Sequence, residues 1–258
     1  MSSLRHADAG RGGFVAAVLD ALLPPRCLGC AASVDVPGRL CPDCWSGVDF
    51  IAPPYCARCG FPFDFDEGEE ALCGACAASP PAFDRARAVL RYGGVARELV
   101  LGFKHGDRTH AAPAFAVWMA QAGGALLAGA AAVAPVPLHR RRLFARRYNQ
   151  AALLARALAR LSGAPFAPDL LARIRPTPSQ AGRSRRARHE NVRGAFAVRG
   201  GRDVAGRHIV LVDDVMTTGA TATACARTLK RAGAGRVDVL TLARVVPSAD
   251  RGGAPFVL

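Results

Sequence analysis

The sequence predicts an α/β protein in which a small cysteine-rich module precedes a domain built on a parallel sheet. Two observations carry this prediction. Eight of the nine cysteines form four Cys-x-x-Cys pairs within residues 27–76, and from residue 83 onward the hydrophobic pattern alternates between strands and helices. With 258 residues, 51% hydrophobic and 21% charged, the chain allows one large domain plus a small module. This composition excludes disordered, collagen-like and coiled-coil proteins.

The four Cys-x-x-Cys pairs predict structural zinc. A two-residue gap lets both thiolates turn toward one ion, and two pairs complete a tetrahedral site with Zn–S bonds of about 2.3 Å. Four ligands leave no open position, so we expect one or two zinc ions that fold the module without taking part in catalysis. Sequential pairing, first with second and third with fourth, is favoured over interleaved pairing. The predicted ligands are Cys27, Cys30, Cys41, Cys44, Cys56, Cys59, Cys73 and Cys76.

The remainder of the chain reads as alternating strands and helices. Strands are predicted over residues 86–92, 131–136, 209–212 and 237–243, and helices over residues 95–104, 150–161 and 221–232. The four aliphatic residues 209–212 suit a central parallel strand. With the helix and strand that follow, they form a βαβ unit, which predicts a parallel sheet.

Residues 213–221 read Asp-Asp-Val-Met-Thr-Thr-Gly-Ala-Thr and join that central strand to its helix. Loops at this edge of a parallel sheet form the ligand crevice, and backbone N–H groups at a helix N-terminus attract a phosphate dianion. The two carboxylates would repel a bare phosphate, but they suit hydroxyl groups or Mg²⁺. A ribose 5-phosphate fits both features, since its phosphate suits the helix N-terminus and its hydroxyls suit the two carboxylates. The alternative is that the threonines only cap the helix. The loop lacks the Walker pattern of a nucleotide triphosphatase.

One segment carries the whole charge imbalance of the protein. The net charge is +14, and residues 139–207 hold 17 arginines against Asp169, Glu190 and Asp203. We therefore expect this segment to face an anionic partner. Only 2 of the 34 basic residues are lysines, so part of the arginine excess reflects compositional bias. Arg156 and Arg160 are examples that we expect at the surface.

The sequence predicts no membrane span and a cytoplasmic location. Residues 12–23 are apolar, but Asp20 interrupts them and no small-residue cleavage site follows. The uncharged run over residues 111–138 is long enough to cross a bilayer, yet it is mostly Ala and Gly. We interpret it as a buried helix, a turn and a buried strand. In the cytoplasm the thiols stay reduced.

Residues 209–221 resemble the diagnostic loop of the type I phosphoribosyltransferases, and the whole chain resembles the ComF family, which joins a zinc-ribbon module to such a domain. The likeness runs from residue 22 to residue 245. Three further segments carry it: Phe103-Lys104-His105-Gly106-Asp107, residues 135–150 and residues 179–196. Where the family usually reads Arg-Gly-Phe-Asn-Gln, this chain has Arg146-Arg147-Tyr148-Asn149-Gln150.

The resemblance implies a parallel-sheet phosphoribosyltransferase fold that binds phosphoribosyl pyrophosphate (PRPP) or ribose 5-phosphate with Mg²⁺. It implies that Asp213 and Asp214 hold the ribose hydroxyls, and that residues 137–140 and 175–193 match the pyrophosphate loop and the mobile catalytic loop. The implied catalytic residues are Asp213, Asp214 and Arg140. The implied PRPP-binding residues also include Lys104, His139, Arg140, Thr217, Thr218, Gly219, Ala220 and Thr221. The arginine-rich segment spans both regions expected to contact pyrophosphate.

Two functions fit these features. One is a PRPP-dependent transferase. The other is a non-catalytic protein that uses the same fold to bind single-stranded DNA, which suits an arginine-rich face. The resemblance also implies a link to DNA uptake and natural transformation, with competence proteins as partners. We expect a leader over residues 1–25, a double zinc-ribbon module over 26–82, a phosphoribosyltransferase-like domain over 83–247 and a tail over 248–258.

Overall fold

The computed structural model describes residues 24–105, 108–139, 143–144, 148–177, 184–200 and 203–247. The chain divides into two compact units, with the division between Gly47 and Val48. In the first unit, residues 26 and 33 form an isolated bridge, and the short helix α2 (Pro42–Ser46) begins directly after Cys41. The second unit contains the sheet, the remaining helices and four of the eight paired cysteines.

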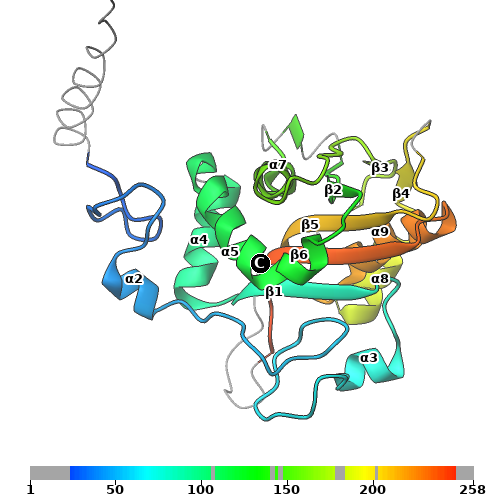
Figure 1. The fold of residues 1–258 in the computed structure, drawn as a ribbon, viewed down its shortest axis with the longest axis horizontal. Helices are drawn as coiled ribbons and strands as arrows, with labels where there is room; N and C mark the ends of the chain where they lie inside the picture. The colour runs from blue at the N-terminus through cyan, green and yellow to red at the C-terminus, as the bar shows by residue number, and fades with distance from the viewer. Residues whose placement is uncertain are drawn as a thin grey trace, which may run out of the picture. The chain divides into compact units, whose positions relative to one another are not determined.

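A four-stranded parallel sheet forms the centre of the second unit (Figure 1). Its strand order is β1-β6-β5-β2. The strands are β1 (Arg85–Arg91), β2 (Ala132–Pro135), β5 (His208–Met216) and β6 (Arg236–Arg244). Of the two central strands, β6 is buried over all but its first residue, and β5 is buried over residues 209–212 and at Met216. Both are rich in Val and Leu, as expected for parallel strands covered on both faces.

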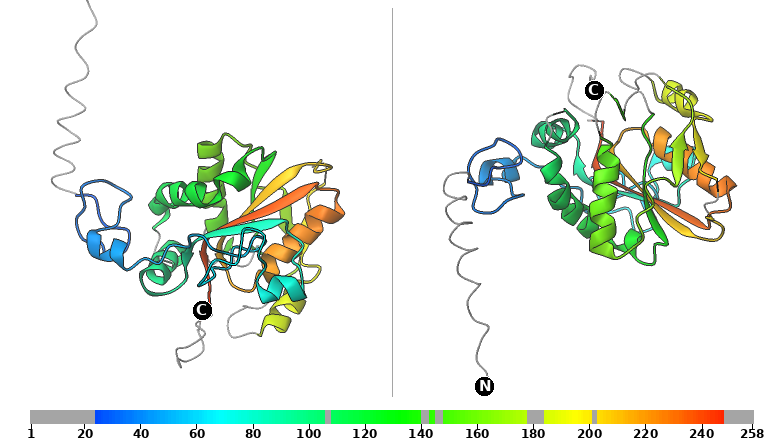
Figure 2. Two further views of the ribbon diagram at one scale, coloured as in Figure 1. Left: turned by 60° about the horizontal axis from the view of Figure 1, so that its bottom comes forward. Right: turned by 90° about the horizontal axis from the view of Figure 1, so that it is seen from above.

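Helices cover both faces of this sheet (Figure 2). On one face lie α5 (Ala112–Leu127) and α7 (Gln150–Ser162), with α4 (Gly94–His105) packed against α5 through Phe103 and Phe115. The opposite face is covered by α9 (Ala220–Arg231). The predicted α/β fold with a parallel sheet is confirmed. The uncharged run is a buried helix, a turn and a strand, as predicted.

The strand that precedes the predicted ligand loop is longer than the sequence indicates. We predicted a strand over residues 209–212 and a loop from Asp213, whereas β5 continues to Met216. The reason is its neighbour β6, which stays paired with β5 up to Met216 and Arg244. Both aspartates therefore lie within the strand, and the loop itself is reduced to residues 217–219.

The second cysteine cluster packs on the sheet face that α9 also covers. Its helix α3 (Gly74–Ala78) begins directly after Cys73. The amide of Ala86 in β1 donates to the carbonyl of Arg58 at 2.7 Å. Gly60 has φ +68°, and a Cβ there would lie 2.6 Å from the carbonyl oxygen of Ala86, so this close approach requires glycine. The cluster thus belongs to the core of the second unit.

Several short elements were not predicted, three of them between α7 and β5. Strands β3 (Leu171–Arg173) and β4 (Phe196–Val198) form a separate antiparallel pair, and α8 (Arg185–Val192) lies within the stretch predicted as the catalytic loop. Three-residue strands are too short for an alternating pattern to appear. The mean hydropathy of α8 is low, so it lacks the apolar stripe by which helices are recognised.

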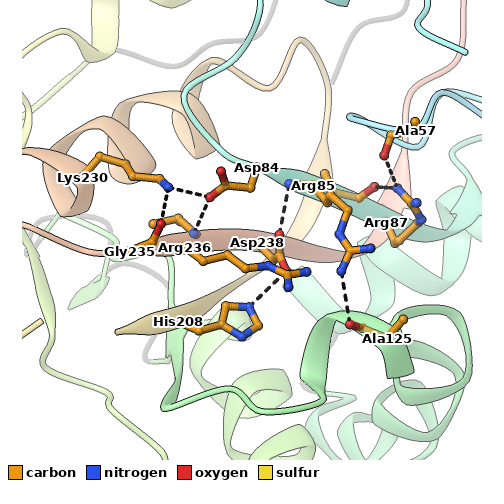
Figure 3. A network of polar contacts seen from close by, with 12 residues as sticks. Ala57, Asp84, Arg85, Arg87, Ala125, His208, Lys230, Gly235, Arg236 and Asp238 are labelled. Atoms are coloured by element: carbon orange, nitrogen blue, oxygen red, sulfur yellow. Dashed lines mark hydrogen bonds and ion pairs between the residues drawn. The ribbon is translucent and has the colours of Figure 1, made fainter. Parts of the chain in front are cut away.

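A polar network closes the amino-terminal edge of the sheet (Figure 3). The fully buried carboxylate of Asp238 accepts from the Arg85 amide at 3.0 Å and lies 3.0 Å from His208 Nε2 and 2.7 Å from Arg236 Nη2. Asp84 pairs with Lys230 at 2.7 Å, which holds α9 to β1. This edge is opposite the predicted ligand edge. Within the described ranges, no helix has the length and apolar character needed to cross a membrane.

Candidate ribose-phosphate site and metal centres

The loop between β5 and α9 directly precedes the amino end of a helix, a kind of position that favours anions. Gly219 occupies the N-cap of α9 in the left-handed conformation with φ +74°. This N-cap residue has no side chain, so it does not cap the helix itself. Thr218 Oγ1 accepts a long hydrogen bond of 3.4 Å from the Ala220 amide. The amino end of a 12-residue helix therefore opens directly onto the loop.

A small hollow, part of it open to solvent, lies at this loop. It is lined by Asp213, Val215, Met216, Thr217, Gly219, Ala220, Thr221, Ala222 and Thr241. Five of these residues were predicted to hold a ribose phosphate or its hydroxyls: Asp213, Thr217, Gly219, Ala220 and Thr221. Thr241 was not foreseen. It lies opposite Asp213 in the register of β5 and β6 and is nearly fully buried.

The two aspartates have different surroundings. Successive side chains of a strand alternate between faces, so Asp213 and Asp214 leave β5 on opposite faces of the sheet. The pKa of Asp213 is raised to about 7, mainly by burial and then by the neighbouring Asp214 carboxylate, whereas the Asp214 amide, Lys104 and Arg173 act in the opposite direction. The Asp214 amide donates to Asp213 Oδ1 at 2.9 Å.

Asp214 faces Lys104 at the end of α4. The Lys104 ammonium lies 3.4 Å from Asp214 Oδ1, and both side chains are largely buried. The structure therefore brings together two residues that the sequence places 110 positions apart. A buried ion pair of this kind fixes the carboxylate at the edge of the sheet.

The segment Tyr148-Asn149-Gln150 holds this edge in place. Gln150 is 1% exposed and its Nε2 donates to the Lys104 carbonyl at 2.9 Å. The Tyr148 hydroxyl donates to the Phe103 carbonyl at 3.3 Å, and Asn149 Nδ2 donates to the Val136 carbonyl at 3.2 Å. Asn149 also caps α7. This segment therefore connects the end of α4 with the end of β2 through hydrogen bonds. The sequence analysis did not predict this role.

The predicted pyrophosphate loop follows β2, the neighbour of β5, at the same edge of the sheet. The Val136 amide donates to the Val212 carbonyl at 2.8 Å, and His139 lies three residues further on. Arg140 and Arg147 lie outside the described residues. Of the predicted catalytic loop, Arg175 donates to the carbonyls of Asn191 and Arg193 at the end of α8. Arg156 and Arg160 are exposed on α7, as expected.

The eight paired cysteines form two clusters, each with all ligand atoms within 4.8 Å of one another. One consists of Cys27, Cys30, Cys41 and Cys44, and the other of Cys56, Cys59, Cys73 and Cys76, which is the sequential pairing. Four sulfurs bonded to one tetrahedral zinc lie about 3.8 Å apart. The Sγ–Sγ distances of 3.6 Å between Cys30 and Cys41 and between Cys59 and Cys73 therefore fit structural zinc.

The chain matches the models of two known protein families, one for each of its two predicted domains. Residues 18–77 match the family of the double zinc ribbon domain, and residues 149–253 match the family of the phosphoribosyl transferase domain. Both matches agree with the arrangement of cysteine clusters and parallel sheet described above.

Similar proteins include Competence protein F of Haemophilus influenzae, 29% identical over 85% of this chain and 96% of that protein. DNA utilization protein YhgH of Salmonella typhi is 35% identical over 74% of this chain and 84% of that protein. Among solved structures, phosphoribosylpyrophosphate synthetase from Mycobacterium smegmatis matches at 18% identity with a TM-score of 0.32, over 52% of this chain and about a third (34%) of the synthetase.

Proposed function

The chain belongs to the ComF family, and on that premise we propose that it binds PRPP or ribose 5-phosphate with Mg²⁺ and transfers the phosphoribosyl group. The observation that carries the proposal is the threonine-rich loop with Gly219 at the amino end of α9, directly after two aspartates. The names of the relatives, Competence protein F and DNA utilization protein YhgH, suggest a place in DNA uptake and natural transformation.

In this proposal different residues bind different parts of the ligand. The backbone amides and hydroxyls of residues 217–221 hold the 5-phosphate, and Asp213 and Asp214 accept from the ribose hydroxyls. The same carboxylates are hard oxygen donors that suit Mg²⁺, which when bound stabilises the charge of the departing pyrophosphate. His139, Arg140 and residues 175–193 face the pyrophosphate. Transfer at the anomeric carbon then depends on positioning and on stabilisation of the leaving charge.

The ionisation of Asp213 makes this binding dependent on pH. Its pKa near 7 means that the carboxylate needed by a hydroxyl or Mg²⁺ forms only partly at neutral pH. We therefore expect Mg²⁺-dependent PRPP affinity to increase as the pH rises from about 6 to 8. The neutral carboxyl can still donate one hydrogen bond, so binding is weakened at low pH rather than abolished.

Calorimetric titration with PRPP and Mg²⁺ tests the proposal. We expect saturable heat in the wild type and affinity reduced about tenfold or more in Asp214→Asn, because a charged hydrogen bond is lost. Asp203→Asn is the matched control: it removes an exposed carboxylate paired with Arg207, away from the loop. Release of pyrophosphate with a nitrogen acceptor then tests transfer. Wild-type protein that gives neither heat nor a thermal shift with PRPP would contradict binding, and equal affinity in Asp214→Asn would contradict the ribose assignment.

The arginine-rich segment supports a second candidate function, single-stranded DNA binding without catalysis. Its 17 arginines against 3 acidic residues suit a phosphate backbone. If about six phosphates are contacted, affinity should fall roughly a thousandfold between 50 and 200 mM salt. A shallow salt dependence would exclude this candidate. We also propose a cytoplasmic location, because zinc-bound thiolates require a reducing compartment.

A further inference from the structure

A buried guanidinium lies between the second cysteine cluster and the candidate phosphate loop. Arg244 is the last residue of β6 and only 8% exposed. Its Nη1 donates to the Cys59 carbonyl at 2.7 Å, and its Nη2 donates to Cys59 Sγ at 3.4 Å. Nη1 also lies 3.1 Å from Met216 Sδ. Arg244 therefore contacts a cysteine of the cluster and the last residue of β5, directly before the loop, at the same time.

Met216 is the link from Arg244 to the loop. It pairs with Arg244 across β5 and β6, and it lines the hollow at the loop. The Val245 amide donates to the Met216 carbonyl at 2.9 Å, so the backbone after Arg244 also holds the end of β5. Gly219 of the loop lies close to the Met216 side chain. A Cβ built on Gly219 would lie 3.9 Å from Met216 Sδ and 3.7 Å from the Phe83 ring.

The charge of Arg244 needs an anion, and the cluster supplies one. Among the residues that the structure describes, no carboxylate forms an ion pair with Arg244. Four thiolates around Zn²⁺ carry a formal charge of about −2, and hydrogen bonds to the sulfurs are a common way to stabilise such a centre. Without the zinc-bound thiolate, a buried cation would be left uncompensated, which is unfavourable.

We propose that Arg244 is a positioning residue through which the second zinc site, formed by Cys56, Cys59, Cys73 and Cys76, sets the conformation of the phosphate loop. The part of this inference that concerns ligand affinity rests on the proposed function. Zinc fixes Cys59, Cys59 orients the guanidinium, and the guanidinium supports Met216 beneath the loop. Loss of zinc from this site, or of Arg244, therefore loosens residues 213–221, whereas loss of zinc from the first site does not.

A second arginine provides a matched control. Arg87 also joins the second cluster to the sheet, since its Nη1 donates to the Ala57 carbonyl at 3.1 Å and its guanidinium lies 4.4 Å from the centre of the Tyr55 ring. Among the described residues, the Arg87 side chain forms no hydrogen bond or ion pair with residues 213–221. Its main-chain carbonyl accepts from Thr241 at 3.5 Å, and the substitution leaves that carbonyl in place. Arg87→Met therefore removes a comparable interaction between cluster and sheet without touching Met216.

The test compares full-length wild type, Arg244→Met and Arg87→Met by hydrogen exchange, zinc content and affinity for ribose 5-phosphate. In Arg244→Met we expect exchange of peptides covering residues 213–223 to be about tenfold faster, with affinity for ribose 5-phosphate weakened to a similar degree. Zinc content should be unchanged. Arg87→Met should stay within about twofold of wild type in both measurements. Loop exchange in Arg244→Met equal to that of Arg87→Met would overturn the inference.

Two further measurements keep the outcome decisive. If Arg244→Met does not fold, zinc can instead be removed from wild type with a chelator, which should speed hydrogen exchange over residues 213–223. Cys41→Ser, which empties the first site alone, should leave that exchange unchanged. Equal exchange over residues 213–223 in zinc-free and zinc-loaded wild type would overturn the inference. By thermodynamic reciprocity, saturating ribose 5-phosphate should raise the zinc affinity of the second site of wild type, and an unchanged zinc affinity would contradict the coupling. If wild type binds no ribose 5-phosphate, the proposed function fails, while the exchange data still decide the role of Arg244.

Discussion

The carboxylate of Asp213 destabilises the folded protein when it is ionised, although the proposed ligand requires it in that form. It is held in the sheet beside a second carboxylate, and burial raises its pKa to about 7. Between about pH 4 and pH 7 the unfolded chain has released this proton while the folded chain still holds it. The unfolded state therefore binds fewer protons, and the contribution of Asp213 to stability falls as the pH rises through this window. Above pH 7 the penalty is constant.

Asp213→Asn should accordingly stabilise the protein at the expense of binding. At pH 8 we expect the melting temperature to rise by about 3–6 °C, equivalent to roughly 1–2 kcal/mol, because a buried charge is removed. The gain should be small at pH 4 and disappear near pH 3, where the carboxyl of wild type is neutral in both states. Thermal melts across this pH range measure the effect. A gain of the same size at pH 4 and pH 8 would show that the charge is not its cause.

Gln150 illustrates a residue whose importance becomes visible only in three dimensions. Its amide holds the carbonyl of Lys104, the residue that pairs with Asp214. Gln150→Leu leaves this carbonyl without its donor, and we expect a loss of about 1–2 kcal/mol in the free energy of unfolding together with weaker PRPP binding. Arg156→Gln, on the exposed face of the same helix, is the control and should change neither. Urea unfolding and calorimetry measure both quantities, and unchanged PRPP affinity in Gln150→Leu would contradict a positioning role.

At the scale of the element, two adjacent glycines in α5 should respond oppositely to alanine. A Cβ on Gly123 would lie 2.6 Å from Leu240 Cδ1 in the buried strand β6, whereas a Cβ on Gly124 meets nothing within 4 Å. Gly123→Ala should cost about 1–3 kcal/mol through overpacking. Gly124→Ala should be neutral or stabilise by up to about 1 kcal/mol through helix propensity. Denaturant midpoints of the two variants test this, and equal midpoints would contradict the close packing of α5 on β6.

Elements with a strong period could be predicted from the sequence, and those fixed by distant neighbours could not. The pattern of α7 and α4 gave their bounds within one residue or so, because each buries one apolar stripe. The length of β5 was underestimated because Asp213 and Asp214 do not resemble strand residues, and only their pairing with β6 keeps them extended. Strands β3 and β4 were missed because each gains its stability from a partner 25 residues away.

The same distinction applies to the candidate site. The two cysteine clusters could be predicted because a shared zinc ion imposes a local spacing on its ligands. The ligand of the threonine loop stays a prediction. Arg244 and Thr241 could not be predicted, because nothing near them in the sequence marks them: the partner of Arg244 is Cys59, 185 positions away. Long-range partners of this kind come from the fold and not from a motif.

For the whole molecule, the division into two units predicts that the two zinc sites fail separately. The first cluster lies in the unit that ends at Gly47, and the second lies in the unit that contains the sheet. Cys41→Ser should release one zinc per chain and unfold the first unit, because metal binding and folding are coupled in such modules. Ribose 5-phosphate affinity should stay within about twofold of wild type. Elemental analysis with calorimetry measures both, and an unaltered zinc content would contradict the ligand assignment.

The central claim is that the turn between β5 and α9 holds the terminal phosphate of a ribose, and a crystal structure of the protein soaked with PRPP and Mg²⁺ tests it most directly. We predict that the phosphate will be bound by the backbone amides of residues 217–221, with the ribose hydroxyls within hydrogen-bonding reach of Asp213 or Asp214. A sugar phosphate bound elsewhere, with this turn unengaged, would contradict the account.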